Sequence, residues 1–244
     1  MTDHRTRDDL SRFLVHLTRE YQGTSAEDNL IAMLRHKCIE ARNAHCLFSP
    51  KIATIGFSKV LQKQFNTVCF TEAPLNQLRY LTQDIPGRRI QLCPYGLVFW
   101  KAHLLDAGAN PAVYVNSKAS GLRGLLLRQF DEHFKELRQY KQFKVQFAND
   151  ADAIISYYSL INIISNRVDF SWEREWRLKG EFKFGFDKLV AIVAPDPNAF
   201  RKTLDGAFGS KLRGELARIP LVSPEWNYEQ LVEEMTFRIW ESKA

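Results

Sequence analysis

No apolar run in this sequence approaches the length of a membrane span. A helix that crosses a bilayer needs roughly 20 mainly apolar residues, and the chain of 244 residues contains no such stretch. Its first nine residues, Met1-Thr-Asp-His-Arg-Thr-Arg-Asp-Asp9, are too polar for a secretory signal peptide. We therefore expect a cytoplasmic protein that does not associate with a membrane, with a polar tail at residues 1–9.

Cysteine is scarce as well, with four residues in the whole chain. Secreted disulfide frameworks belong to short, Cys-rich domains, so we expect reduced thiols. The stretch that holds His36, Cys38, His45 and Cys46 gathers possible metal ligands. Their spacing matches no familiar zinc pattern, and we predict no metal site.

Glycine-rich phosphate loops are also missing. The sequence has neither GxGxxG nor GxxxxGK[ST], which argues against a Rossmann cofactor site and against a P-loop. No repeat, low-complexity tract or linker divides the chain, and 45% hydrophobic with 25% charged residues is ordinary for a globular protein. We expect one α+β domain over residues 1–244, with a mixed, split β-sheet flanked by helices.

Local patterns predict the elements of this domain. We expect strands at 10–18, 67–75, 95–100, 111–116, 171–178, 182–186, 189–194 and 219–222, and helices after an N-cap at Ser25 and at 57–64, 101–108, 122–146, 152–165, 198–213 and 227–235. Residues 38–50 are predicted to be a loop that ends at Pro50. Apolar residues surround the helix predicted at 152–165, which indicates a helix buried on all sides.

Basic residues exceed acidic ones, with a formal net charge of +6. Such a charge favours polyanionic partners. The helix predicted at 122–146 carries many Arg and Lys residues on its outer face, but Asp131, Glu132 and Glu136 interrupt them. Two interpretations stay open: a solvated helix face, or phosphate contacts to nucleic acid.

The clearest chemistry lies between Asp169 and Gly180. If 171–178 is a strand, its side chains alternate between two faces. One face carries Glu173, Glu175 and Arg177, and the other carries Trp172, Arg174, Trp176 and Leu178. Such carboxylates lie roughly 7 Å apart and raise one another's pKa unless a cation intervenes. They suit a substrate that develops positive charge, or they form a Glu-Arg ion pair over packed Trp rings.

Three further stretches offer candidate ligand contacts. His16 and Thr18 share one face of the first strand, where they would bond ribose or phosphate oxygens or lie in the core. Thr71 and Glu72 stand where the strand at 67–75 meets its loop, so Glu72 either binds a ligand or starts a helical turn. Tyr95 would stack on a ligand or pack as a buried aromatic residue.

Six short motifs, in this order, resemble the AbiGi-like abortive-infection family of bacterial phage defence over about residues 10–180. The motifs are Phe13-Leu-Val-His-Leu-Thr18, Asn29-Leu-Ile-Ala-Met-Leu34, Val68-Cys-Phe-Thr-Glu-Ala-Pro-Leu75, Tyr95-Gly-Leu-Val-Phe99, Asn110-Pro-Ala-Val-Tyr114 and Glu173-Arg-Glu-Trp-Arg177. The opening His-x-Thr strand and Asn-Leu helix are also similar to the DarT-like DNA ADP-ribosyltransferases.

The transferase resemblance implies an ADP-ribosyltransferase-like split sheet that binds NAD. It implies a cofactor pocket made by His16, Thr18, Thr71 and the strand that ends at Arg177. The stacking ring would be Tyr95 or Tyr158. Glu175 would stabilise the ribosyl cation, Glu173 would orient a nucleic-acid or protein acceptor, and Arg177 would keep both acids ionised. The chain lacks the Ser-Thr-Ser strand of the Glu-x-Glu class.

The two resemblances lead to two hypotheses. The first is a phage-defence enzyme, an NAD-dependent ADP-ribosyltransferase. The second is a non-enzymatic, antitoxin-type module of a two-gene defence system, whose Glu-Arg face would meet a cognate toxin or antitoxin partner.

Overall fold

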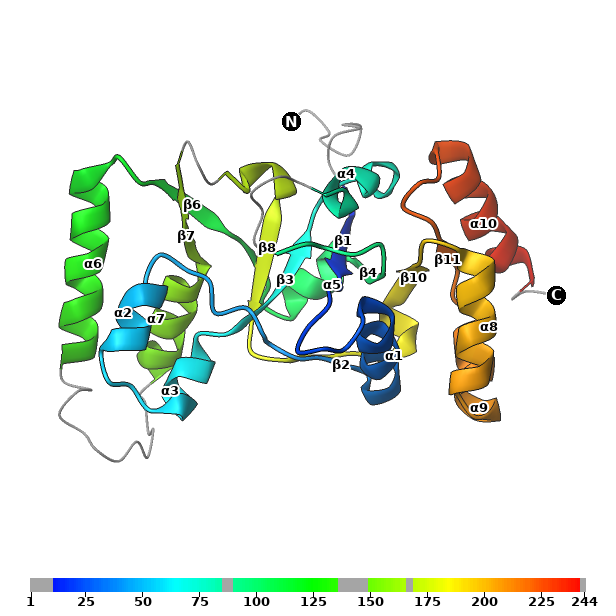
Figure 1. The fold of residues 1–244 in the computed structure, drawn as a ribbon, viewed down its shortest axis with the longest axis horizontal. Helices are drawn as coiled ribbons and strands as arrows, with labels where there is room; N and C mark the ends of the chain where they lie inside the picture. Colours follow the sequence, from blue (N-terminus) through cyan, green and yellow to red (C-terminus); the bar gives the residue numbers. More distant parts are fainter. Residues whose placement is uncertain (1–10, 85–89, 136–148, 166–168, 242–244) are drawn as a thin grey trace. The chain divides into compact units, whose positions relative to one another are not determined.

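The computed structural model describes residues 11–84, 90–135, 149–165 and 169–241 (Figure 1). Contacts along the chain form two compact units. The first unit comprises Met1–Ile39, Phe70–Ala107 and Lys183–Ala244, and the second comprises Glu40–Cys69 and Gly108–Phe182.

The first unit is built on a mixed β-sheet. Its strands follow the spatial order β11 (Leu221–Val222), β10 (Leu189–Val193), β4 (Gly96–Trp100), β1 (Phe13–Leu17) and β3 (Thr67–Thr71), the last of which begins in the second unit. β10 and β11 are parallel, and the other neighbouring pairs are antiparallel. The alternation predicted for the first strand is confirmed, because Val15 and Leu17 belong to one apolar cluster and Phe13 packs against it.

Helices and turns flank this sheet. They are α1 (Ala26–His36), η2 (Leu75–Gln77), α4 (Arg79–Thr82), α5 (Lys101–Asp106), η5 (Phe186–Lys188), α8 (Pro197–Ala207), α9 (Ser210–Ala217) and α10 (Tyr228–Glu241), with the short strands β2 (Cys38–Ile39) and β9 (Phe182–Lys183) between them. Val15 and Val98 pack on one sheet face with Leu78 and with Leu231 of α10. Ser25 caps α1 as predicted, since its side chain accepts a hydrogen bond from the amide of Asp28. The predicted α+β class with a mixed sheet flanked by helices is confirmed.

The second unit contains more helix and two small strand pairs. Its elements are α2 (Ser49–Thr54), α3 (Lys59–Gln64), β5 (Asn110–Pro111), β6 (Val113–Asn116), α6 (Ser120–Lys135), α7 (Asn149–Leu160), β7 (Ile161–Ile164), η4 (Ser171–Glu173) and β8 (Glu175–Lys179). β6 pairs with β7 in parallel, and β5 pairs with β8 antiparallel.

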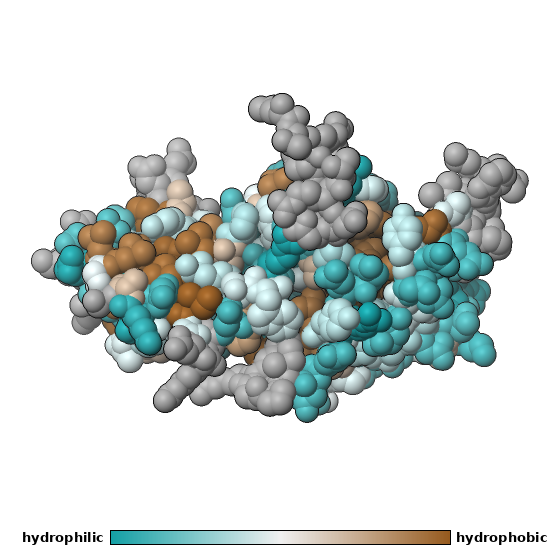
Figure 2. All heavy atoms as spheres, turned by 90° about the horizontal axis from the view of Figure 1, so that it is seen from above, coloured by the Kyte–Doolittle hydropathy of each residue, from teal (hydrophilic) through white to brown (hydrophobic). Residues whose placement is uncertain are grey.

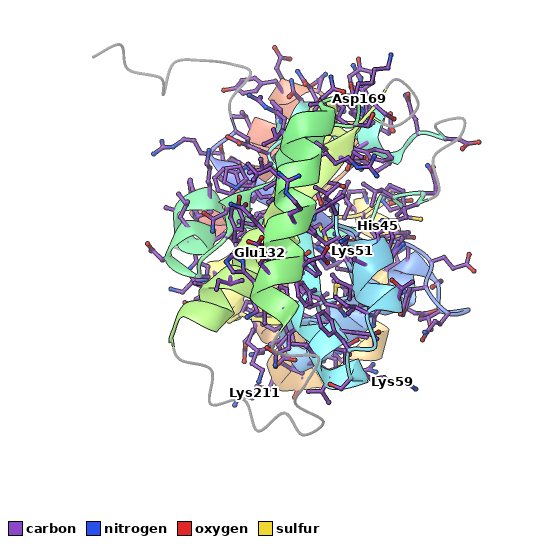
Figure 3. All side chains as sticks on the ribbon, turned by 90° about the vertical axis from the view of Figure 1, so that its left-hand side faces the viewer. His45, Lys51, Lys59, Glu132, Asp169 and Lys211 are labelled. Atoms are coloured by element: carbon purple, nitrogen blue, oxygen red, sulfur yellow. The ribbon has the colours of Figure 1, made fainter. Side chains whose placement is uncertain are left out.

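Apolar side chains of the second unit also reach the surface. Val113 of β6 is 52% exposed, and Leu122 of α6 is 50% exposed. Figure 2 shows hydrophobic residues gathered on the part of the second unit that carries α6 and β6. Figure 3 looks onto α6, with Glu132 labelled on the helix and Lys51 beside it.

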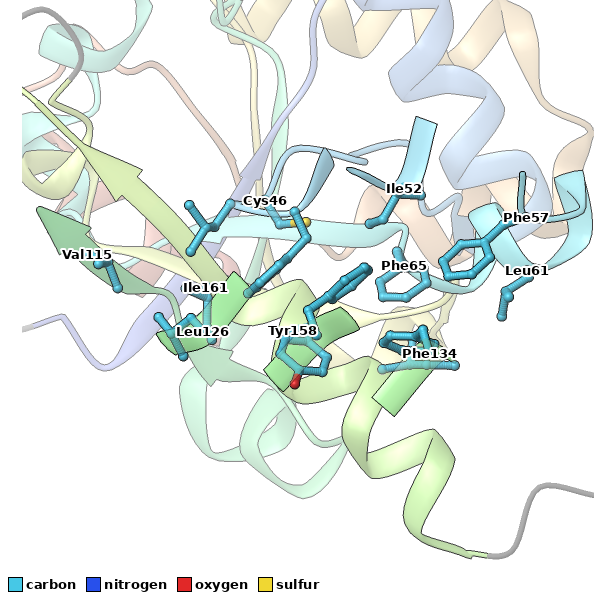
Figure 4. Close-up of a cluster of buried hydrophobic side chains, with 14 residues drawn as sticks. Cys46, Ile52, Phe57, Leu61, Phe65, Val115, Leu126, Phe134, Tyr158 and Ile161 are labelled. Atoms are coloured by element: carbon cyan, nitrogen blue, oxygen red, sulfur yellow. The ribbon is translucent and has the colours of Figure 1, made fainter. Parts of the chain in front are cut away.

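An aromatic cluster fills the core of this unit (Figure 4). Phe48 stacks on Phe130 at 4.7 Å between ring centroids, with the planes 9° apart. Phe65, Phe134 and Tyr158 surround this pair, and all five residues are at most 2% exposed. These large rings are almost completely buried, and their packing holds α6 and α7 against the loop before α2.

The prediction of a helix over 152–165 is wrong in its second half. α7 ends at Leu160, and Ile161–Ile164 is the strand β7. Periodicity does not separate a buried strand from a buried helix in a short apolar run, and β-branched isoleucine favours the strand. α7 is also not buried on all sides, because Tyr157 is 49% exposed.

Other boundaries differ from the sequence prediction as well: the strand expected at 67–75 ends at Thr71, the one at 182–186 ends at Lys183, and the one at 111–116 is divided between β5 and β6. The loop expected at 38–50 contains β2, and Pro50 lies in the first turn of α2 rather than ending a loop, since proline suits the first turn of a helix. The single helix expected at 198–213 is two helices, α8 and α9, separated at Phe208 and Gly209. Residues 136–146 of the helix expected at 122–146 lie outside the described residues.

The aromatic cluster yields the first prediction. Phe130→Ala should lower the free energy of unfolding by roughly 3–5 kcal/mol, because it deletes a ring that five other rings contact and leaves a cavity. Val60→Ala is the control, since Val60 is 68% exposed, and should change stability by about 0.5 kcal/mol or less. Urea unfolding measures both, and equal effects would contradict the packing described.

Candidate buried carboxylate and arginine site

A capped turn introduces the strand that carries the candidate acids. The carboxylate of Asp169 accepts hydrogen bonds from the amide of Ser171 at 2.9 Å and from its hydroxyl at 2.6 Å. The chain then forms the 3₁₀ turn η4, and Arg174 ends it with φ of +48°. A left-handed conformation costs a residue with a side chain roughly 1–2 kcal/mol. This turn places Glu173 before β8, not on it.

The structure therefore corrects the predicted strand at 171–178. β8 begins only at Glu175, so Glu173 does not share a strand face with Glu175 and Arg177. Both faces of β8 are covered: Trp176 and Leu178 are each 6% exposed, and Arg177 on the opposite face is 1% exposed. Trp172, expected to pack beside Trp176, is 42% exposed.

Glu175 and Arg177 form a buried, two-pronged ion pair. The Arg177 Nε donates to Glu175 Oε1 at 2.9 Å, and Nη2 donates to Oε2 at 3.1 Å. The side chains are only 1% (Arg177) and 11% (Glu175) exposed. Paired donors of this kind match the shape of a carboxylate and are among the stronger polar contacts in proteins.

Two neighbours complete the surroundings of the Glu175 carboxylate. The hydroxyl of Tyr114 on β6 donates to Oε2 at 2.8 Å. The thiol of Cys69 on β3 also hydrogen-bonds to this carboxylate, and it accepts a hydrogen bond from Asn43 Nδ2 at 2.8 Å. A carboxylate offers about four lone-pair sites. Two nitrogens of Arg177, the Tyr114 hydroxyl and the Cys69 thiol match that capacity.

The other end of the guanidinium joins distant parts of the second unit. Arg177 Nη1 donates to the carbonyl of His45 at 2.6 Å and to the carbonyl of Ser159 at 2.7 Å. His45 lies in the loop before α2, and Ser159 lies in the last turn of α7. A helix end leaves carbonyls without partners inside the helix, and Arg177 satisfies one of them.

These contacts determine the charge state of the site. Burial by itself would raise the pKa of Glu175, but Arg177, Tyr114 and Cys69 together hold that pKa below its ordinary value of 4.5. Burial lowers the pKa of Arg177, yet the Glu175 charge more than offsets this effect and raises it. The pair is therefore ionised at neutral pH.

The pKa values of Cys69 and Tyr114 are raised, whereas that of Glu175 is lowered. Burial, followed by the Glu175 charge, raises the pKa of the Cys69 thiol to about 12. The same two causes, in the same order, raise the pKa of the Tyr114 hydroxyl. Both groups keep their protons at neutral pH and act as donors. A protonated thiol is a poor nucleophile, so Cys69 has the character of a structural group.

His16, Thr18, Thr71 and Tyr95, predicted for the cofactor pocket, belong to the first unit. The Thr18 hydroxyl donates to the carbonyls of Ala26 at 3.0 Å and Tyr95 at 3.2 Å. Thr71 is 6% exposed, and its hydroxyl accepts a hydrogen bond from the Ala73 amide at 3.1 Å. His16 is half-buried, and its ring packs edge-on against the Phe70 ring, with 5.9 Å between the ring centroids.

Both predicted stacking rings have protein partners. The Tyr95 hydroxyl donates to Glu27 at 2.9 Å, and burial together with Glu27 raises its pKa to about 12. Tyr158, in the second unit, is 0% exposed in the aromatic cluster, and its hydroxyl lies 2.7 Å from His133 Nδ1. As described, the Tyr158 ring offers no open face to a ligand.

Glu72 has a close partner within the first unit. Its carboxylate is 2.6 Å from Lys101 Nζ, and its side chain is 10% exposed. Glu72 follows β3, while Lys101 follows β4. Because β1 pairs with each of these strands, the ion pair spans the end of β1. This contact gives Glu72 a structural role that neither of the sequence interpretations contained.

The possible metal ligands at residues 36–46 are divided between the two units. His36 and Cys38 belong to the first unit, and His45 and Cys46 belong to the second. Among the described residues, no group of three or more His, Cys, Asp and Glu side chains is arranged to hold a metal ion. Within the same part of the chain, no helix combines the length and the apolar character needed to cross a membrane.

Sequence reasoning identified Glu175 and Arg177 but missed their partners. Tyr114 and Cys69 stand in predicted strands and carry polar groups among apolar neighbours, which was the available signal. The carbonyls of His45 and Ser159 left no signal, because every residue has a carbonyl.

Comparison of the chain with protein-family models, with curated proteins and with solved structures gave no match.

The ion pair yields a prediction about stability. Glu175→Gln and Arg177→Met should each lower the free energy of unfolding by roughly 3–5 kcal/mol, since each leaves a buried charge without its partner. The double variant should lose clearly less than the sum of the two. Glu40→Gln is the control: Glu40 is 67% exposed in its pair with Arg42, and the change should cost about 1 kcal/mol or less. Additive losses in urea unfolding would show that the pair is not coupled.

A second prediction concerns pH. Because the pKa of Glu175 is lowered in the folded state, the unfolded state binds more protons as pH falls. The stability due to this carboxylate is therefore fully present above about pH 4.5 and is lost as pH falls through the folded pKa. The difference in unfolding free energy between wild type and Glu175→Gln should shrink between about pH 7 and about pH 3. A difference that stays constant would mean that folding leaves the pKa of Glu175 unchanged.

Proposed function

We propose that this protein is a phage-defence component that works by binding a macromolecular partner, and that Glu175 and Arg177 belong to its framework. The motifs that resemble the AbiGi-like family support the defence role. One observation carries the choice of binding over catalysis: the Glu175 carboxylate already accepts from as many donors as it has lone-pair sites. Such a group has no position left for a substrate hydroxyl.

The residues named for an NAD pocket do not fit that cofactor as they lie. Thr18 donates to backbone carbonyls, the Tyr158 ring is 0% exposed, and Glu175 is enclosed by its donors. A ribose hydroxyl would have to displace Tyr114, Cys69 or part of Arg177. Each displacement would leave a buried polar group without a partner, which is costly.

One feature favours the second candidate, an NAD-dependent ADP-ribosyltransferase. Trp172 is 42% exposed, the half-buried Glu173 follows it, and Arg174 holds a left-handed conformation. Unusual backbone conformations of this kind gather at functional sites. An exposed indole beside a carboxylate suits a nucleobase or an acceptor side chain. In this alternative, Glu173 is the residue that would face the acceptor.

An assay with NAD separates the two candidates. The purified protein, incubated with NAD and with single-stranded or duplex DNA or RNA, should release no nicotinamide if it is a binding module. Turnover that survives in wild type and falls at least a hundredfold in Glu173→Gln would favour the transferase instead. Glu173 is the better target than Glu175, because Glu175→Gln is expected to weaken the fold.

The binding role has its own test. Co-expression with the product of the neighbouring gene should give a stable complex on size exclusion and should alter phage plaque counts. The variant Trp172→Ala should weaken the complex if the η4 turn is part of the contact, and Val60→Ala serves as the exposed control. A lack of binding together with NAD turnover would reject the proposal.

A further inference from the structure

Positive charge is concentrated in α8, α9 and the turn that joins them. Residues 197–218 contain five basic and two acidic residues, so this segment carries half of the net charge of +6. Arg201 of α8 donates to the carbonyls of Leu216 at 2.8 Å and Ile219 at 2.7 Å. The start of α8 therefore lies beside the end of α9, and the two helices form an antiparallel hairpin within the first unit (Figure 1).

The side chains of α9 sort onto two faces, as the 3.6-residue turn requires. Leu216 is 1% exposed, and Leu212, one turn before it, is half-buried, so both face the interior of the unit. The outer ridge of the helix consists of small residues: Ser210, Gly214 and Ala217, spaced by four and three residues and all exposed. The outermost surface of α9 therefore carries no bulky side chain.

Three exposed cations flank this ridge. Lys211 and Arg218 are seven residues apart, close to two turns and about 10 Å along the helix axis, so they lie on one flank. Arg218 follows the last helical residue with φ of −79° and ψ of −13°, so helical spacing applies to it as well. Arg213 lies on the other flank. The ridge of α9 thus runs between two positively charged sides.

The fold itself does not use these three charges. Among the described residues, no carboxylate pairs with Lys211, Arg213 or Arg218, and Glu215 of α9 pairs instead with Lys37 at 3.1 Å. Lys211 also lies in the first turn of α9, where the helix dipole disfavours a positive charge. Unpaired cations in such positions favour an anionic partner outside the chain.

The glycine on the ridge has no conformational reason either. A Cβ on Gly214 would meet nothing within 4 Å, and Gly214 has no positive φ. Glycine inside a helix is unfavourable compared with alanine. Its effect here is to keep the ridge low between the charged flanks, so that another molecule can approach the helix closely.

We propose that α9 lies in the major groove of duplex DNA, with its small ridge toward the bases and its cations against the phosphates. The major groove is about 12 Å wide and admits an α-helix, whose diameter with side chains is about 10–12 Å. Arg213 then meets one strand, while Lys211 and Arg218 meet the other. This contact does not rest on the proposed function, because it uses a different surface, in the first unit.

The make-up of this surface selects duplex DNA among anionic partners. A membrane-binding helix inserts Trp, Phe or Leu side chains, and the ridge has none. Single-stranded nucleic acid is held by stacking on aromatic rings, and none is exposed in residues 197–218, all of which the structure describes. The major groove of duplex RNA is too deep and narrow for side chains to enter.

The ridge also predicts binding without sequence preference. Base edges are recognised mainly by long polar side chains such as Arg, Lys, Asn and Gln, and the ridge offers only the hydroxyl of Ser210. Contacts to phosphates position a protein on DNA but carry no sequence information. Duplexes of unrelated sequence should therefore bind equally well.

Fluorescence anisotropy with a short labelled DNA duplex tests the proposal on purified protein free of nucleic acid. The logarithm of the affinity should fall with the logarithm of the salt concentration with a slope of roughly −3, for three phosphate contacts. Lys211→Glu with Arg218→Glu should lower the affinity at least about tenfold and the slope to roughly −1. No binding at low salt would overturn the proposal, as would equally tight binding to duplex RNA, to single strands or to vesicles of anionic lipid.

A matched control separates this surface from net charge. Arg123→Glu with Arg128→Glu changes the net charge equally at exposed positions of α6, and should leave the affinity within about twofold of wild type. An equal loss in both double variants would mean that charge alone attracts DNA. A loss confined to the α6 variant would place the DNA on the second unit. Either result would reject the site on α9.

A substitution that keeps the charge tests the groove geometry. Gly214→Leu should weaken binding about tenfold, because its side chain holds the helix away from the groove, and should leave the salt slope unchanged. Gly121→Leu is the control, since a Cβ there also meets nothing within 4 Å and the position is exposed on α6. Both variants should keep the melting temperature of wild type. Binding by Gly214→Leu as tight as by wild type would exclude α9 from the groove.

Discussion

The second unit depends on how one guanidinium is satisfied. Arg177 is 1% exposed, and a charge removed from water destabilises a fold unless partners surround it. The bidentate contact to Glu175 neutralises its charge, and the carbonyls of His45 and Ser159 take a further nitrogen. Because these partners come from a strand, a loop and a helix end, the correct fold of the unit is the one that brings them together.

The hydrogen bonds that surround the Glu175 carboxylate bear on whether it could react with a substrate. A catalytic carboxylate needs an open position that strengthens its contact as the reaction proceeds. Here Tyr114 and Cys69 occupy the positions that Arg177 leaves. The features that remain for recognition lie at the surface: the exposed indole of Trp172 on the η4 turn, and the exposed cations of α9.

Local sequence rules predicted those elements in which the tertiary contacts favour the same secondary structure as the local sequence does. The alternation in β1 and the Ser25 cap of α1 needed only period two and a side-chain oxygen before a helix. The predictions failed where the local signal was shared by two structures. Ile161–Ile164 is apolar enough for helix or strand, and pairing with β6 decides for the strand. Ser171–Glu173 alternates like a strand, but Asp169 caps it as a turn.

The sequence by itself determined the α+β class, most strands, and the fact that Glu175 and Arg177 stand two residues apart and therefore on one side of a strand. Only the tertiary structure decided that this side is buried and which groups surround the pair. The reason is distance along the chain. The donors and acceptors that complete the pair belong to residues 45, 69, 114 and 159. These residues are far apart in the sequence, so no local spacing rule links them, and only the packing of the folded unit brings them together.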